Sequence, residues 1–453
     1  MNTHQRVLLL LFALSVFLTP FMGSAVNLAL PAIAREFHFD LVTTGWVATS
    51  FLLSAAVFLV PFGRIADLYG RKRIFLTGNL LFCLSSLWAA LAWSGWSFFA
   101  ARILQGLSSA MLFGTGNAIL VSVFPPEQRG KVMGINVSAV YLGLALGPVL
   151  GGLLTDFFGW RSLFFFPAIL GAGVVGMAFA ALQGEWVEAK GERFDIMGSL
   201  LYAAAIIFLL QGSTHLPHGN AILLLVLGIV CSVVFLILET RLKHPVLEIS
   251  IFRTNRVFAF SGLAALLNYS ATFAVTFLLS LYLQIAKGLN PRHAGLFLLI
   301  SPVMMTLGSP FAGRLSDRKD PGKLASLGMG LIAMFLVILL FLRQDTPLWL
   351  VGVAMAINGI GTALFSSPNA NAIMGSVEKR QLGLASSMLG SLRLLGQMMG
   401  MGVTLFVINL VVGEVALDIS MVPQFLRASH ILFVIFIGLC LAGVFASLAR
   451  IRK

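Results

Sequence analysis

The chain has 453 residues, of which 58% are hydrophobic and only 10% are charged. Soluble globular domains carry about 25% charged residues, so this composition excludes a soluble domain and indicates a protein that crosses the membrane several times. The net charge of +13 does not indicate a nucleic-acid partner, because the cations fall in short segments between apolar runs, as they do when they orient a membrane protein.

Fourteen apolar runs are predicted as membrane-spanning helices, because about 20 residues at ~1.5 Å each cross ~30 Å of hydrocarbon. In chain order the predicted spans are 7–34, 44–62, 74–93, 97–122, 131–155, 162–182, 196–212, 220–239, 257–284, 293–312, 324–342, 347–370, 382–412 and 428–449. The first run exceeds the ~7 to 15 apolar residues of a signal peptide, so we expect a span there and not a cleaved leader. The predicted fold class is therefore an all-α polytopic membrane protein.

The cations are divided unevenly between the two sides of these spans. With both termini in the cytoplasm, 22 of the 30 Lys and Arg lie on the cytoplasmic side and six on the outer side. The asymmetry predicts a multi-pass protein of the plasma (inner) membrane with both termini cytoplasmic. The three cysteines, Cys83, Cys231 and Cys440, lie singly inside apolar runs, so we expect no disulfide, metal or cofactor.

Two similar basic segments, Gly63–Arg73 and Gly313–Lys323, lie 250 residues apart and share a glycine, an arginine, an aspartate and a final cation in register. A later acid and arginine recur at an offset of 251: Glu127 and Arg129, then Glu378 and Arg380. Both basic segments are interpreted as loops between spans. The repeated unit is therefore a set of membrane helices, which is typical of transporters with two halves.

The repeat also predicts the domain organisation. The second and tenth spans precede the two basic segments, so two more helices lie between the copies than a six-plus-six arrangement contains. The extra pair is assigned to spans 196–212 and 220–239, which follow the polar linker Gly184–Asp195. The predicted parts are a six-helix bundle (1–183), a linker with two accessory helices (184–256) and a second six-helix bundle (257–453).

The first basic segment places one carboxylate among several cations, so Asp67 is expected to accept charge-assisted hydrogen bonds. Such a cluster can latch one half against the other, whereas a solvated orientation signal would explain the cations but not the repeated glycines. The candidate gating residues are Gly63, Arg64, Asp67, Gly70, Arg71, Arg73, Gly313, Arg314 and Asp317.

Glycines in span 131–155 recur every four residues and share one helix face, which allows a neighbouring backbone to approach closely. Pro148 removes a helical hydrogen bond beside them. The spacing fits close packing and a gating seam equally well. The residues of this motif are Gly143, Gly147, Pro148, Gly151 and Gly152.

These motifs together resemble a known family. Gly63–Arg73 resembles the loop signature of the major facilitator superfamily, Arg102–Gly106 (RILQG) resembles its fourth-helix motif, and Gly143–Gly152 (GLALGPVLGG) resembles the fifth-helix motif of its exporters. With fourteen spans, the whole chain is similar to the fourteen-helix drug:proton antiporter family. The resemblance implies a major facilitator fold with two additional central helices, a gate at the fifth-helix seam, protons as coupling ion and a monomer. It implies roles for Arg102, Gln105 and Gly106.

Two arginines, Arg102 and Arg393, lie within predicted spans, where an unpaired charge costs on the order of 2.5 to 3.5 kcal/mol. Both are expected to face the protein interior, either paired with backbone carbonyls or available to a ligand. None of the 17 carboxylates lies mid-span. Met22 stands where many cation-exporting relatives carry an acid, so Asp67 and Asp156 at helix ends are the remaining coupling candidates.

Uncharged polar and soft side chains occupy mid-span positions and suit varied amphipathic ligands, although interhelical hydrogen bonding would also explain each one. The candidate cavity residues are Met22, Asn27, Asn117, Asn268, Tyr269, Asn358, Arg393 and Gln397. The sequence predicts a membrane transporter that exports small amphipathic molecules, neutral or anionic, through alternating access and in contact with membrane lipid. A dedicated lipid or organic-anion exporter is the alternative. A membrane-embedded enzyme or a sensor is disfavoured, because no catalytic constellation or output domain is found.

Overall fold

The computed structural model describes residues 3–189, 191–192, 194–215, 219–242, 247, 250–316, 318–377, 382–413 and 419–450. Within these ranges the regular structure is helical, and fourteen helices are long and apolar enough to cross a membrane. The prediction of an all-α polytopic protein with fourteen spans is confirmed.

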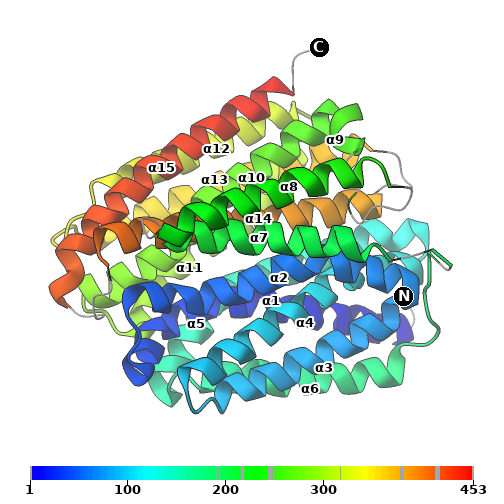
Figure 1. Ribbon diagram of the computed structural model, residues 1–453, viewed down its shortest axis with the longest axis horizontal. Helices are drawn as coiled ribbons and strands as arrows, with labels where there is room; N and C mark the ends of the chain where they lie inside the picture. Colours follow the sequence, from blue (N-terminus) through cyan, green and yellow to red (C-terminus); the bar gives the residue numbers. More distant parts are fainter. Residues whose placement is uncertain are drawn as a thin grey trace. The chain divides into compact units, whose positions relative to one another are not determined.

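Long helices dominate the described chain (Figure 1). The first eight are α1 (Thr3–Phe37), α2 (Leu41–Tyr69), α3 (Arg71–Ala90), α4 (Gly95–Val123), α5 (Pro126–Phe158), α6 (Ser162–Ala181), α7 (Ile196–His215) and α8 (Gly219–Glu239). After the short α9 (Ser250–Thr254) come α10 (Arg256–Leu281) with the π-helix η1 (Tyr282–Ala286), α11 (Pro291–Ser316), α12 (Pro321–Leu340), α13 (Leu348–Gly375), α14 (Leu382–Val411), the 3₁₀-helix η3 (Ile419–Met421) and α15 (Val422–Ala449).

The chain divides into two compact units. The first unit comprises Met1–Ala32, Trp46–Leu209 and Leu224–Glu248, and the second comprises Ile33–Gly45, Leu210–Leu223 and Ile249–Lys453. Most of α8 and the first part of α7 therefore belong to the first unit.

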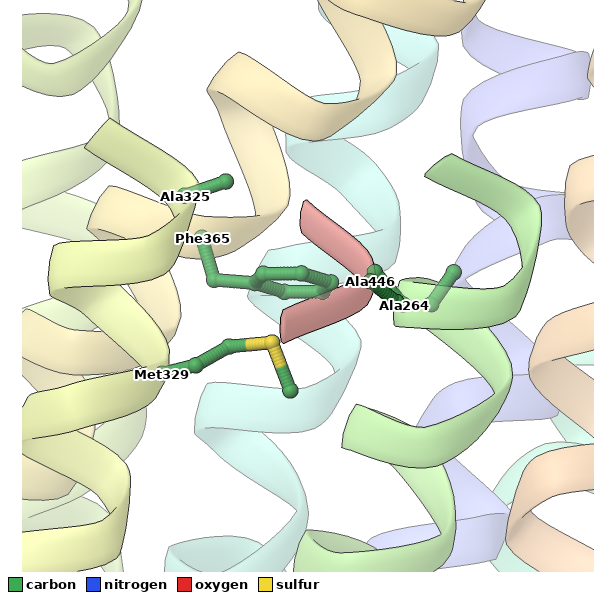
Figure 2. Packing of buried hydrophobic residues seen from close by; sticks show 6 residues of the cluster. Ala264, Ala325, Met329, Phe365 and Ala446 are labelled. Atoms are coloured by element: carbon green, nitrogen blue, oxygen red, sulfur yellow. The ribbon is translucent and has the colours of Figure 1, made fainter. Parts of the chain in front are cut away.

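One cluster in the core of the second unit packs small side chains around an aromatic ring. The Phe365 ring from α13 packs among Ala264 of α10, Ala325 and Met329 of α12, and Ala446 of α15 (Figure 2). Alanine at these contacts lets three helices approach one aromatic ring of a fourth. Close approach matters because van der Waals packing, and not water exclusion, holds helices together in lipid. Figure 1 shows the resulting neighbours α12 and α15 side by side.

Polar contacts join helices inside the first unit. Ser15 Oγ of α1 donates to Asn79 Oδ1 of α3 at 2.8 Å, and Asn79 Nδ2 donates to the Phe75 carbonyl at 2.9 Å. Both side chains are buried, so the hydrogen bonds satisfy groups that hydrocarbon would leave without partners.

The sequence repeat is visible in helix packing within each unit. A Cβ atom added to Gly106 of α4 would lie 2.8 Å from Ser54 Cβ of α2. In the second unit, a Cβ atom added to Gly359 of α13 would lie 2.6 Å from Met304 Cβ of α11. Ser54 and Met304 are 250 residues apart, the same offset as the two basic segments. Equivalent glycines therefore permit equivalent helix approaches in both units.

The interpretation of the two basic segments as loops is wrong for most of their length. Helix α2 continues to Tyr69 and α3 begins at Arg71, so Gly70 alone interrupts the helices. Helix α11 likewise continues to Ser316 and includes Gly313 and Arg314. Ala66 remains buried at 1% exposure, and this packing continues the helix beyond the apolar run that defined the predicted span.

Helix α5 packs on α1 through glycines that leave no room for a side chain. A Cβ atom on Gly143 would lie 2.6 Å from the Phe17 carbonyl oxygen, and one on Gly151 would lie 2.8 Å from the Ala25 carbonyl oxygen. A Cβ atom on Gly147 would overlap Ser24 Oγ. The backbones of the two helices are therefore in close contact along three turns of α5.

We predict that Gly151→Val lowers the thermal stability of the purified protein by about 1 to 3 kcal/mol, the cost of overpacking a close contact. The matched control is Gly173→Val in α6, where an added Cβ meets no atom within 4 Å. Melting of both variants in detergent provides the measurement. Equal melting temperatures for the two variants would show that the seam tolerates a side chain.

Candidate functional site

The junction of α2 and α3 requires glycine at position 70. Gly70 has φ of 120°, a conformation that side-chain-bearing residues rarely adopt. A Cβ atom there would also lie 2.5 Å from Glu185 Cδ. Across this turn Arg71 Nε donates to Asp67 Oδ1 at 2.8 Å, so the expected hydrogen bonding of the aspartate is present.

The arginines of the first basic segment pair with three glutamates from the polar segment after α6. Arg64 pairs with Glu192, Arg71 Nη1 lies 3.3 Å from a carboxylate oxygen of Glu188, and Arg73 Nε lies 3.6 Å from one of Glu185. All six residues belong to the first unit. We call Glu185, Glu188 and Glu192, with the backbone of residues 186–189, the acidic strap.

Backbone hydrogen bonds also hold the acidic strap. The Arg71 amide donates to the Trp186 carbonyl at 2.9 Å, and the amides of Glu188 and Ala189 donate to the Asp67 carbonyl at 3.1 and 3.0 Å. The Lys72 amide donates to Glu185 Oε1 at 2.8 Å. Sequence reasoning treated this segment as a polar linker. Three acids within eight residues were a usable signal, but the sequence could not assign their partners, which lie more than 100 residues away along the chain.

The second basic segment has different surroundings. A Cβ atom on Gly313 would lie 3.1 Å from Ser367 Oγ of α13, and Arg314 is exposed in the last turn of α11. Asp320 caps α12, because its Oδ1 accepts from the amides of Gly322 at 2.7 Å and Lys323 at 3.2 Å. The candidate Asp317 lies outside the described residues, as do Glu378 and Arg380.

Arg450, directly after α15, is a buried cation that sequence reasoning counted only as an orientation signal. Its Nη1 donates to Ser261 Oγ at 2.6 Å and to Asn369 Oδ1 at 2.8 Å, and its Nη2 donates to the Pro321 carbonyl at 3.0 Å. Burial lowers the pKa of Arg450 to about 10, so it stays protonated at neutral pH. It ties α10, α12 and α13 to the end of α15.

Arg102 of α4 is fully enclosed, with 0% of its surface exposed. Its Nε donates to the Val47 carbonyl at 3.1 Å, its Nη1 donates to Gln105 Oε1, and its Cζ lies 4.6 Å from the Phe51 ring centroid. Among the described residues no carboxylate forms an ion pair with it, and its Nη2 has no hydrogen-bond partner. Arg102 therefore faces the protein interior as expected and is paired with a backbone carbonyl.

The rest of the fourth-helix motif supports this arginine. Gln105 Nε2 donates to Ser86 Oγ of α3 at 2.8 Å, and this contact orients the amide oxygen toward Arg102. Gly106 allows α4 to approach α2, and Ser54 Oγ of α2 donates to the Ile103 carbonyl at 2.6 Å. The motif thus holds one buried charge between α2, α3 and α4.

Arg393 of α14 has a different environment. It is half-buried, and its Cζ lies 5.2 Å from the ring centroid of Tyr269 on α10. Gln397, one turn further along α14, is buried. Helix α14 approaches α10 closely here, because a Cβ atom on Gly396 would lie 2.5 Å from the Leu266 carbonyl oxygen. Tyr269 and Arg393 therefore contact each other across two packed helices, and Gln397 follows Arg393 by one turn of α14.

The remaining candidate cavity residues are distributed between the units. Asn268 of α10 is 1% exposed, and neither polar atom of its amide has a partner among the described residues. Asn358 Nδ2 donates to Ser301 Oγ at 2.9 Å within the second unit. In the first unit Met22 is 0% exposed and Asn27 is 3% exposed, both on α1.

Three further candidates lie on α4 and α5. The side chain of Asn117 is outside the described part of the chain. Pro148 lies inside α5 and Gly152 is buried. Asp156 is exposed in the last turn of α5, so protein does not enclose its carboxylate.

The sequence model of the Major Facilitator Superfamily matches residues 12–401 and 261–451. The chain belongs to the Major Facilitator Superfamily. As a member of this superfamily it is a membrane transporter and not an enzyme, as the sequence predicted.

Its similar relatives include a riboflavin transporter, RibZ, of Clostridioides difficile, which is 30% identical over 88% of this chain and 87% of the relative. The multidrug resistance protein Stp of Mycobacterium tuberculosis is 30% identical over 89% of this chain and 76% of the relative. Among solved structures, a bacterial homologue of the human lysosomal transporter Spinster matches with a TM-score of 0.71 at 14% identity, over 99% of this chain and 97% of that one. The last likeness shows the fold.

We predict that Arg102→Met keeps or raises the thermal stability of the transporter but lowers its transport at least ten-fold. Replacing buried ionic groups is often neutral or stabilising when no charge is left behind without its partner. Arg102 has no carboxylate partner in the described structure, so Arg102→Met leaves no such charge. Melting in detergent and transport in vesicles provide the two measurements. Arg102→Lys is the control for charge. Normal transport by Arg102→Met would assign the arginine to packing alone.

Proposed function

We propose that this transporter exports amphipathic small molecules that are neutral or negatively charged. The observation that supports the proposal is the charge inventory of the described spans. The charged side chains in mid-span are arginines, Arg102 and Arg393, while the acids of the described helices lie near helix ends. A carboxylate that would neutralise a cationic substrate is not found in the middle of any described span.

Export as the direction is supported by the fifth-helix motif and by the relatives. The fifth-helix motif resembles that of exporters, and its glycines pack α5 closely on α1, as a gating seam would require. Several relatives carry names of drug or antibiotic resistance, including the methylenomycin A resistance protein of Bacillus subtilis, 28% identical over 89% of this chain. The riboflavin transporter among the relatives supports an amphipathic organic molecule as substrate more broadly.

Arg393 is our candidate for contact with a negatively charged substrate. Arg102 is enclosed by protein, whereas Arg393 is half-buried beside Tyr269. An aromatic ring stabilises the guanidinium and leaves its hydrogen-bond donors free for a carboxylate or sulfonate. Asn268, Tyr269 and Gln397 supply neighbouring polar groups, and the roles of Met22, Asn27, Asn117 and Asn358 as further cavity residues stay proposals.

The mechanism proposed is alternating access, in which two repeated six-helix bundles rock around a midplane site. The bundles are residues 1–183 and 257–453, with 184–256 as linker and accessory helices. The α5 seam would act as gate together with the basic segments, each of which would move with its own unit. Protons are the proposed coupling ion, with Asp67 or Asp156 as carrier, in a monomer of the inner membrane whose termini face the cytoplasm. Asp156 is exposed, whereas Asp67 is paired with Arg71.

A dedicated organic-anion or lipid exporter is the second candidate function. It is supported by Met22, which is fully buried at the place where many cation-exporting relatives carry an acid. Both candidate functions predict that cationic substrates are transported poorly. They differ in breadth, since a dedicated exporter would handle one chemical class.

We predict that vesicles containing the transporter accumulate neutral and anionic amphipathic dyes but not cationic dyes of similar size. A pH-sensitive dye in the same vesicles should report proton movement when substrate is added. Arg393→Gln should lower transport of the anionic dye about ten-fold and leave the neutral dye within two-fold, because one charge-assisted contact contributes ~1.5 to 3 kcal/mol. Arg393→Lys is the control that keeps the charge. Transport confined to cations would contradict the proposal.

A further inference from the structure

We propose that the acidic strap is a permanent brace: it stays bound to the ends of α2 and α3 throughout the transport cycle and ties the accessory helix α7 to them. The inference rests on the proposed transport function. In this proposal the guanidinium groups of Arg64, Arg71 and Arg73 bind partners in their own unit. The sequence alone had instead suggested that they latch one half against the other.

Each glutamate of the strap pairs with a different arginine of the basic segment. Glu185 pairs with Arg73, Glu188 with Arg71, and Glu192 with Arg64. The Arg64 and Arg71 side chains are only 17% and 15% exposed, so they are partly removed from water. Withdrawing the strap would leave partly buried arginines short of partners, which is unfavourable.

The backbone contacts make the association independent of any single charge. The Asp67 carbonyl at the end of α2 accepts from two strap amides, and the Trp186 carbonyl accepts from the first amide of α3. The last carbonyls and the first amides of a helix have no hydrogen-bond partner within it, so they need partners from elsewhere. The strap therefore completes the C-terminus of α2 and the N-terminus of α3 at once.

The strap continues directly into α7, which is fixed to α2 a second time. Asp195 Oδ1 accepts from the Gly198 amide at 2.9 Å and so caps the start of α7. Two turns into α7, Tyr202 Oη donates to the Ala56 carbonyl of α2 at 3.1 Å. The Tyr202 ring also lies 5.6 Å from the Phe235 ring of α8. Through the strap and Tyr202, the accessory helices are anchored to α2 at two levels.

Permanence follows from the number of contacts. Releasing the strap in every cycle would break three ion pairs with α2 and α3 and four hydrogen bonds that involve the backbone. All of these contacts lie inside one compact unit, so a rocking motion of that unit as a body leaves them intact. A transport cycle that keeps the strap bound avoids the free-energy cost of breaking these contacts.

The first test swaps the charges of Arg64 and Glu192, the least exposed of the pairs that join the strap to the basic segment. Arg64→Glu and Glu192→Arg should each lower the maximal transport rate per folded molecule about five-fold with KM unchanged, a coupling of the size found for contacting residues. The double variant should return to within two-fold of the wild type. Arg253→Glu, an exposed cation elsewhere in the chain, controls for net charge. Single variants that match the wild type, or a double variant that is not restored, would overturn the brace.

The second test fixes the strap covalently. Arg73→Cys and Glu185→Cys replace the longest ion pair, in a background in which Cys83, Cys231 and Cys440 are serine and transport is verified. A short bis-maleimide should link the two thiols, and the linked transporter should keep its rate within two-fold of the unlinked one. Failure to link, or a larger loss of rate on linking, would show that the strap is absent from this place or must leave it.

Failure of the brace and failure of the proposed function are distinguishable. If the wild type transports none of the dyes, the proposed function fails, and the four charge-swap proteins are compared by melting temperature. Restoration of stability in the double variant would then still support the brace. Its absence would overturn the brace whatever the substrate is.

Discussion

Hydrocarbon offers no hydrogen bonds, and this constraint decides where the polar side chains of the transporter lie. Asn79, Arg102 and Arg450 each obtain partners from neighbouring helices, so each polar group also fixes the helices around it. Glycine is also required, because it lets helices approach closely enough for these polar side chains to reach their partners. The Asn268 amide and Nη2 of Arg102 have no hydrogen-bond partner among the described residues, so they remain available for hydrogen bonds inside the membrane. Such groups are costly, and their retention is typical of functional positions.

The spans and the repeat were predictable because both depend on local composition. An apolar run of about 20 residues has few alternatives to a membrane helix. The 250-residue offset of the basic segments appears again between Ser54 and Met304, on which Gly106 and Gly359 pack. Helix ends were less predictable. Polar residues can continue a helix into water, as Arg64 and Asp67 do in α2, and no hydropathy pattern marks that continuation.

The local pairing of Asp67 with Arg71 was predictable, but the distant partners of individual charges were not. Glu192 lies 128 residues from Arg64, and Arg450 lies 189 residues from Ser261, so their proximity depends on the packed fold. The same is true of the two mid-span arginines, which the sequence treated alike. Phe51 and Gln105 enclose Arg102, while Arg393 has Tyr269 on one side and remains half-buried. Burial thus separates a charge that organises the bundle from one that can meet a ligand.

Alternating access as proposed requires two repeated bundles inserted with the same orientation, so that both basic helix ends reach the cytoplasm. Single cysteines at Tyr69 and Lys319, both exposed, test this most directly in a background without the three native cysteines. A membrane-impermeant maleimide should label both positions in inverted vesicles and neither in intact cells. Labelling of one position from each side of the membrane would contradict the shared orientation, and with it the proposal of alternating access.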